Sequence, residues 1–139
     1  MKNMTNVKAR EKGKKELAAV FKSLKFKDGL TEKNITANDF LYYYNRARDG
    51  QKGNYIIYET IESNPAVRAD NVVYGREYFA QIDIFSVYSF ETKKLCDVIS
   101  GIEERLTEKM FEVDMKEELY ESDTGLYHQI LYVSKTYYF

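Results

Sequence analysis

The first regular pattern of apolar residues in the chain is helical. Four apolar residues recur at the i, i+3, i+4 and i+7 spacing of one helix face: Leu17, Val20, Phe21 and Leu24. Lysines occupy the opposite face. The pattern predicts a helix that begins near Val7 or Arg10, is weakened at Gly13, and ends at about Leu24, before the Lys27-Asp28-Gly29 segment.

The chain from residue 30 to residue 61 favours strands. Residues 40–44 are aromatic and apolar, which favours a strand, although Thr36 or Asn38 could instead cap a short helix. Glycine-containing turn signals predict an exposed, hairpin-like loop over residues 46–54. Residues 55–61 carry apolar side chains on both faces, which is typical of a strand in the middle of a sheet.

The next two segments are expected to differ in kind. Residues 63–75 contain Pro65, the Ala69-Asp70-Asn71 sequence and Gly75, so we expect a long irregular connection. Residues 76–88 alternate regularly and form the clearest predicted strand. Four of its residues are expected to face the core: Tyr78, Ala80, Ile82 and Ile84.

The last third of the chain predicts a helix and a hairpin. Five apolar residues recur with helical spacing: Leu95, Val98, Ile99, Ile102 and Leu106. Ser89 or Thr92 can cap this helix, and Gly101 would permit close packing against the sheet or a neighbouring subunit. Strands over residues 111–121 and 127–138 flank a turn at residues 122–125. Four residues of the first strand are expected on one face: Phe111, Val113, Met115 and Leu119.

This order of elements predicts the fold class. Residues 1–139 are expected to form a single α+β domain, with a mostly antiparallel sheet of four to five strands covered on one face by two helices. Residues 1–9 are expected to be a flexible basic N-terminus.

Composition narrows the class of protein. The 139 residues include 44% hydrophobic residues and one proline, which suits one domain with a real core. The lone Cys96 cannot form an intrachain disulfide, so a reducing cytoplasm is the expected place of synthesis. The longest apolar runs are too short to cross a bilayer, so we expect no membrane association.

Charge is uneven along the chain although the net charge is only −1. Residues 1–28 carry nine Lys or Arg against three acids, and residues 91–123 carry eleven acids against five bases. Such unlike regions can contact each other within or between subunits, or can be two solvated faces. The 13 tyrosines and 8 phenylalanines suit interfaces, although tyrosine is also a good strand residue.

The residues needed for known kinds of catalysis or cofactor binding are scarce. His128 and Cys96 are the only residues of their types, which excludes a four-ligand zinc site and leaves no recognisable nucleophile and base pair. No glycine-rich phosphate-binding motif is present. Arg46 and Arg48 lie near three tyrosines but lack the wider basic groove of a single-strand binder. We therefore expect no enzyme activity, no metal and no cofactor.

Three segments carry a resemblance to a known family: residues 54–59 (NYIIYE), 68–71 (RADN) and 81–86 (QIDIFS). With the following amphipathic helix and closing hairpin, they resemble the tail terminator, or tail-completion, proteins of long-tailed phages and prophages of Gram-positive bacteria. The resemblance covers about residues 15–138.

The resemblance implies a structural protein without enzymatic activity. Members of that family form a ring, commonly a hexamer, that ends tail-tube polymerisation and then joins the tail to the head. The implied partners are further copies of the chain, the tail-tube protein and a head-completion protein, with DNA met only in the ring lumen. The implied location is the virion tail, assembled in the host bacterial cytoplasm.

Two segments are the expected contact regions of such a ring, residues 46–54 and 63–76. Their polar residues are the candidate interface residues: Arg46, Arg48, Arg68, Asp70, Asn71 and Arg76. Two other functions stay open. The chain could be a head-completion or neck connector protein, or a small DNA-binding regulator that uses the basic face between Lys8 and Lys27.

Overall fold

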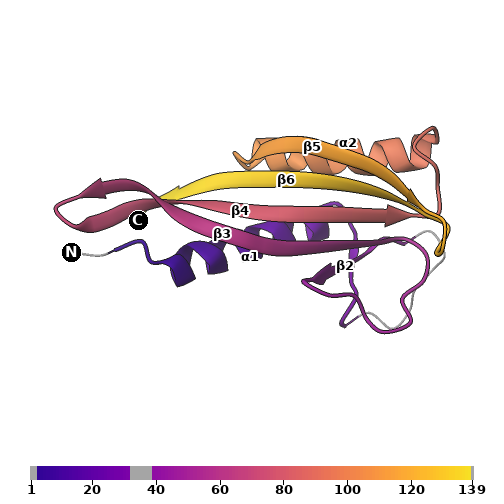
Figure 1. The fold of residues 1–139 in the computed structure, drawn as a ribbon, viewed down its shortest axis with the longest axis horizontal. Helices are drawn as coiled ribbons and strands as arrows, with labels where there is room; N and C mark the ends of the chain where they lie inside the picture. Colours follow the sequence, from indigo (N-terminus) through magenta and orange to yellow (C-terminus); the bar gives the residue numbers. More distant parts are fainter. Residues whose placement is uncertain (1–2, 32–38, 139) are drawn as a thin grey trace.

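A mixed β-sheet forms one layer of the protein, and two helices form the other (Figure 1). The computed structural model describes residues 3–31 and 39–138, so Thr36 and Asn38 lie outside the described residues. The elements are α1 (Asn6–Ser23), β1 (Lys27–Asp28), β2 (Leu41–Tyr44), β3 (Tyr55–Ala69), β4 (Val72–Ser86), α2 (Lys93–Glu108), β5 (Glu112–Glu121) and β6 (Leu126–Tyr138). The expected α+β domain with two helices is confirmed.

The sheet of the described residues has six strands in the order β1-β2-β3-β4-β6-β5, which is more than the expected four to five. The β3/β4, β4/β6 and β5/β6 pairs are antiparallel, whereas β1/β2 and β2/β3 are parallel. The loop at residues 46–54 is therefore not a hairpin, because it returns the chain to start β3 beside the start of β2. Such a short return is possible because β2 has only four residues.

The expectation of a long irregular connection at residues 63–75 is wrong. This segment is the far part of a β3–β4 hairpin that extends beyond the rest of the sheet (Figure 1). Asp70 and Asn71 both have positive φ, 49° and 64°, which fits the two-residue turns of tight hairpins. Pro65 is tolerated in β3 because β2 pairs with β3 only as far as Tyr58, and an edge strand can accept proline.

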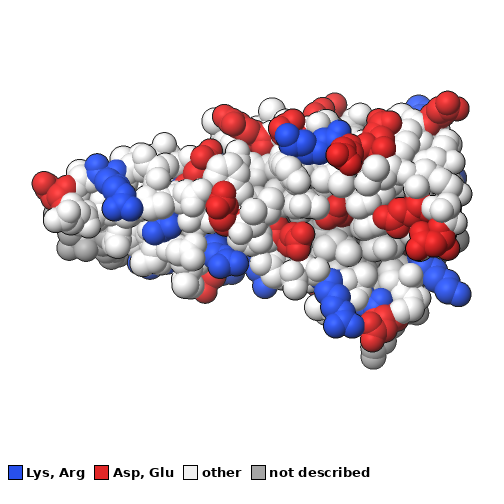
Figure 2. Space-filling view, in the orientation of Figure 1, with Lys and Arg blue, Asp and Glu red and all other residues white. Residues whose placement is uncertain are grey.

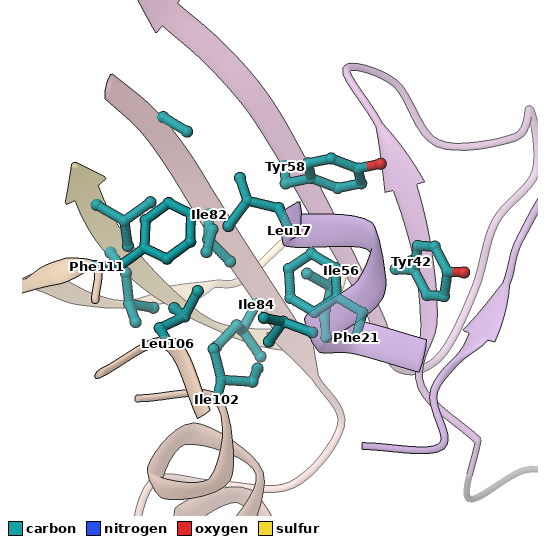
Figure 3. Close-up of a cluster of buried hydrophobic side chains, with 14 of the residues drawn as sticks. Leu17, Phe21, Tyr42, Ile56, Tyr58, Ile82, Ile84, Ile102, Leu106 and Phe111 are labelled. Atoms are coloured by element: carbon teal, nitrogen blue, oxygen red, sulfur yellow. The ribbon is translucent and has the colours of Figure 1, made fainter. Parts of the chain in front are cut away.

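The core lies between the sheet and the helices, as Figure 3 shows for a central cluster. The prediction for β4 is confirmed: its four expected core residues are fully buried. They pack with residues of α1, α2, β3 and β6: Leu17, Phe21, Ile56, Ile102, Leu106 and Leu131.

Strand β5 departs from the predicted pattern. Phe111, just before it, is buried, but Met115 and Leu119 are 37% and 39% exposed. A bulge between Met115 and Glu118 shifts the register, so Leu119 pairs with His128 and lies on the other face of the sheet from Val113. The expectation of one shared face for these residues is therefore wrong.

Both helices begin at capping threonines. Thr5 Oγ1 accepts a hydrogen bond from the Lys8 backbone N–H, and Thr92, one of the two predicted caps, does the same for Leu95. Residues 3–9 belong to the expected flexible N-terminus, and its flexibility stays a prediction. Met4 is buried and its N–H donates to the Val73 carbonyl. No helix in the described ranges is long and apolar enough to span a membrane.

The packing of α1 on the sheet requires glycine at position 13, a role that the sequence analysis did not predict. A Cβ at Gly13 would overlap the ring of Tyr78, which is fully buried on β4. At Gly101 a Cβ would only touch Leu24, at 3.7 Å. The close approach of helix to sheet therefore depends on Gly13 in α1, and not on Gly101.

We predict opposite effects of alanine at these two glycines. Gly13→Ala should lower the free energy of unfolding by about 1–3 kcal/mol, because the cost of overpacking exceeds the gain in helix propensity. Gly101→Ala should raise it by about 0.5–1 kcal/mol. Urea unfolding of both variants provides the test, and equal effects at the two sites would contradict the packing described here.

Three core tyrosines have a raised pKa, so they keep their phenol protons at a higher pH than an exposed tyrosine does. Burial raises the pKa of Tyr78 to about 12, and burial raises the pKa of Tyr58 further still. For Tyr137, burial combines with a hydrogen bond to the nearby Glu16 carboxylate to raise the pKa. In the unfolded chain each would titrate near pH 10.

This difference predicts loss of stability in alkali. Below about pH 10 the folded protein and the unfolded chain both keep the phenol protons, so these groups do not change the stability. Above it the unfolded chain loses protons that the folded protein retains, so stability falls as the pH rises toward 12. Urea unfolding between pH 8 and pH 11.5 should show the decline, with a shallower slope for Tyr78→Phe. A constant midpoint across that range would refute the expectation.

Candidate interaction surface on the open face of the sheet

The predicted interface residues lie in two separate places. Arg46 and Arg48 are in the loop between β2 and β3, whereas Arg68, Asp70 and Asn71 lie at the far end of the β3–β4 hairpin. These two regions are at opposite ends of the long axis of the molecule (Figure 1). Arg46 is exposed and pairs with Asp49 at 2.7 Å.

Two of the predicted arginines bind backbone within the same chain. Arg48 Nη2 donates to the Gly29 carbonyl at 2.5 Å. Arg76 donates from Nε to the Met4 carbonyl at 3.0 Å and from Nη1 to the Ser63 carbonyl at 2.9 Å. Arg76 therefore ties the start of the chain to the hairpin.

A larger surface, not foreseen from the sequence, is the side of the sheet that faces away from the helices. Figure 2 shows this side, which we call the open face. Strand alternation and register place on it one set of residues from four strands: Tyr55, Ile57, Glu59, Glu62, Glu77, Phe79, Gln81, Asp83, Phe85, Glu112, Asp114, Leu119, His128, Ile130, Tyr132 and Ser134. No helix of the described residues covers it.

One half of the open face is aromatic and apolar. The rings of Tyr55 and Phe85 stack at 4.5 Å between centroids, and Phe85 stacks on His128 at 4.1 Å. Ile57 and Ile130 occupy the next row along the strands, on either side of Asp83. A sheet face that contacts only solvent usually carries fewer aromatic and apolar side chains.

A buried polar cluster lies within this aromatic half. His128 Nε2 lies 2.7 Å from an Asp83 carboxylate oxygen, and its Nδ1 lies 3.2 Å from Glu121. Gln81 Nε2 donates to both oxygens of Asp83 at 3.1 Å, and Asp83 is only 8% exposed. A charged imidazolium can donate to both carboxylates, whereas a neutral ring can donate to only one.

The lone cysteine of the chain does not belong to this cluster. Cys96 lies on α2 and bonds to the Phe90 carbonyl, on the helix side of the sheet. Among the described residues, no group of three metal-ligating His, Cys, Asp or Glu side chains is close enough to hold an ion. The sequence interpretation of His128 as a structural or surface histidine fits its place in the sheet, but Asp83 as its partner is visible only from the strand register.

The other half of the open face is acidic. Five carboxylates occupy three successive rows across the strands: Glu59, Glu62, Glu77, Glu112 and Asp114. Lys116, which lies in the β5 bulge, pairs with Asp114 at 2.7 Å. Figure 2 shows red side chains spread over this face and blue ones mainly toward its rim and the hairpin.

The opposite side of the molecule carries the reverse charge along α1. Four lysines are exposed there at the spacing of one helix stripe, which we call the α1 stripe: Lys8, Lys12, Lys15 and Lys22. Its buried counterpart packs Leu17 and Val20 against the sheet. Acidic and basic surfaces therefore lie on opposite sides of one thin molecule.

No protein-family model matches the chain, and no curated protein matches it either.

We predict that the His128 cluster stabilises the fold. His128→Ala should lower the free energy of unfolding by about 2 kcal/mol, because it removes the stack on Phe85 and leaves the buried Asp83 carboxylate with Gln81 alone. Ser134→Ala, on the same strand and face, should change it by less than about 0.5 kcal/mol. Chemical unfolding compares the two, and a wild-type midpoint for His128→Ala would show that the cluster is energetically neutral.

Proposed function

We propose that this protein is a structural phage assembly protein, a tail terminator whose copies form a ring on the end of the tail tube. The observation that carries the proposal is the pair of unlike surfaces on opposite sides of the sheet, the acidic and aromatic open face and the basic α1 stripe. No catalytic activity is assigned to the protein.

Unlike surfaces favour a ring over a symmetric pair. Two copies that met through their open faces would bring five carboxylates against five others, which is unfavourable. A contact between the open face of one copy and the α1 stripe of another leaves the stripe of the first copy and the open face of the second unused. Such contacts continue until the chain of subunits closes, and closure gives a ring.

The shape of the subunit supplies two further contact regions for such a ring. The β3–β4 hairpin extends from one end of the molecule, and the loop between β2 and β3 lies at the other (Figure 1). The exposed Arg68 and Arg46 belong to these two ends. We assign one end to the tail-tube protein and the other to the head-completion protein, and a neck connector would use the same arrangement.

One observation favours a second candidate, a DNA-binding regulator. The α1 stripe presents several lysines on one exposed helix face, which could follow a phosphate backbone. That function requires DNA affinity that falls steeply with salt. It also requires that reversal of Lys12 and Lys15 to Glu abolish binding.

The assembly function predicts a defined mass and a defined partner. Light scattering at several concentrations should detect a species of about six subunits, and negative-stain images should show closed rings, either free or on the ends of isolated tail tubes. Tube ends saturated with the protein should stop elongating when fresh tube protein is added. A protein that stays monomeric and leaves tube elongation unchanged would refute the proposal.

A further inference from the structure

We infer that the open face of one subunit is the docking site for the α1 stripe of the next subunit. This inference rests on the proposed ring, and it names the surfaces that build it. It commits the uncovered side of the sheet to a second copy of this chain, held by contacts between acidic side chains and lysines.

Charge complementarity is the first argument. The acidic half of the open face presents five carboxylates, and the one strand lysine beside them, Lys116 of β5, pairs with Asp114 at 2.7 Å. The α1 stripe presents lysines, with Glu11 as the only acid among its exposed neighbours on the helix. Each surface therefore repels a second copy of itself and attracts the other surface.

The dimensions of the two surfaces agree. At about 1.5 Å per helical residue, the stripe from Lys8 to Lys22 is about 21 Å long. At about 3.4 Å per residue, the open face from Glu77 to Phe85 along β4 is about 27 Å long. One helix can therefore lie along the strands and reach both halves of the face.

Tyrosine rings on the open face also suit lysine side chains. Within the chain, Lys14 Nζ already lies 4.0 Å from the centre of the Tyr44 ring, and Lys116 Nζ lies 5.3 Å from that of Tyr132. Tyr132 is 42% exposed on the open face, between the acidic and aromatic halves. A lysine from a neighbouring α1 can place its apolar stem on such rings and its ammonium group near a carboxylate.

Charge reversal on each surface tests the docking. One variant reverses the open face with Glu59→Lys, Glu62→Lys and Glu112→Lys, and a second reverses the stripe with Lys12→Glu, Lys15→Glu and Lys22→Glu. A matched control reverses three exposed acids elsewhere, with Glu91→Lys, Glu104→Lys and Asp123→Lys. Circular dichroism and urea unfolding confirm that each variant is folded.

Each reversed variant should need at least a roughly tenfold higher protein concentration than the wild type to form rings. The control variant should form rings at the wild-type concentration. An equimolar mixture of the two reversed variants should assemble again, because every interface then joins opposite charges. A single chain that carries all six reversals should also assemble. The readout is mass by light scattering, or occupancy of tail-tube ends where rings form only there.

The outcomes separate the docking from the function. Rings that persist in both reversed variants would overturn the docking and leave the ring itself intact. Loss of assembly that neither the mixture nor the six-fold reversal restores would also overturn it. A wild-type protein that forms no ring, free or on tubes, overturns the proposed function instead.

Discussion

The antiparallel pairing of β3 with β4 is the contact on which the rest of the structure depends. It places Ile82 and Ile84 toward the helices and Asp83 and Phe85 toward the open face. A slip of one residue would exchange these two sets and leave both faces wrong. The turn at Asp70 and Asn71 fixes one end of the pairing, and β6 repeats the register on the other side of β4.

The helix layer depends on that register through one contact. Tyr78 lies on the helix side of β4, and its ring occupies the space that a side chain at position 13 would need. Its hydroxyl lies 3.0 Å from Thr60 Oγ1 on β3. At position 13, helix α1 can therefore approach Tyr78 closely because it has no side chain there, while its buried apolar residues face the sheet and turn the basic stripe outward.

Much of the fold could be predicted from local pattern, and the open face could not. The stripes of α1 and α2 and the alternation of β4 are strong because burial on one side imposes a clear period. The hairpin at residues 63–75 was missed because proline, asparagine and glycine usually mark irregular loops, whereas here they form an edge strand and a two-residue turn. His128 and Asp83 are 45 positions apart in the sequence, so only the register brings them together.

The thin, two-sided shape also bears on the proposed assembly function. If copies associate through opposite sides of the sheet with a rotation about the long axis of the molecule, every β3–β4 hairpin projects from the same end of the ring. Every loop between β2 and β3 then lies at the other end (Figure 1). A ring built in this way has two chemically different ends, because a heterologous contact preserves the direction of each subunit. Two different ends are what a protein requires if it is to cap a tube on one side and meet a head on the other.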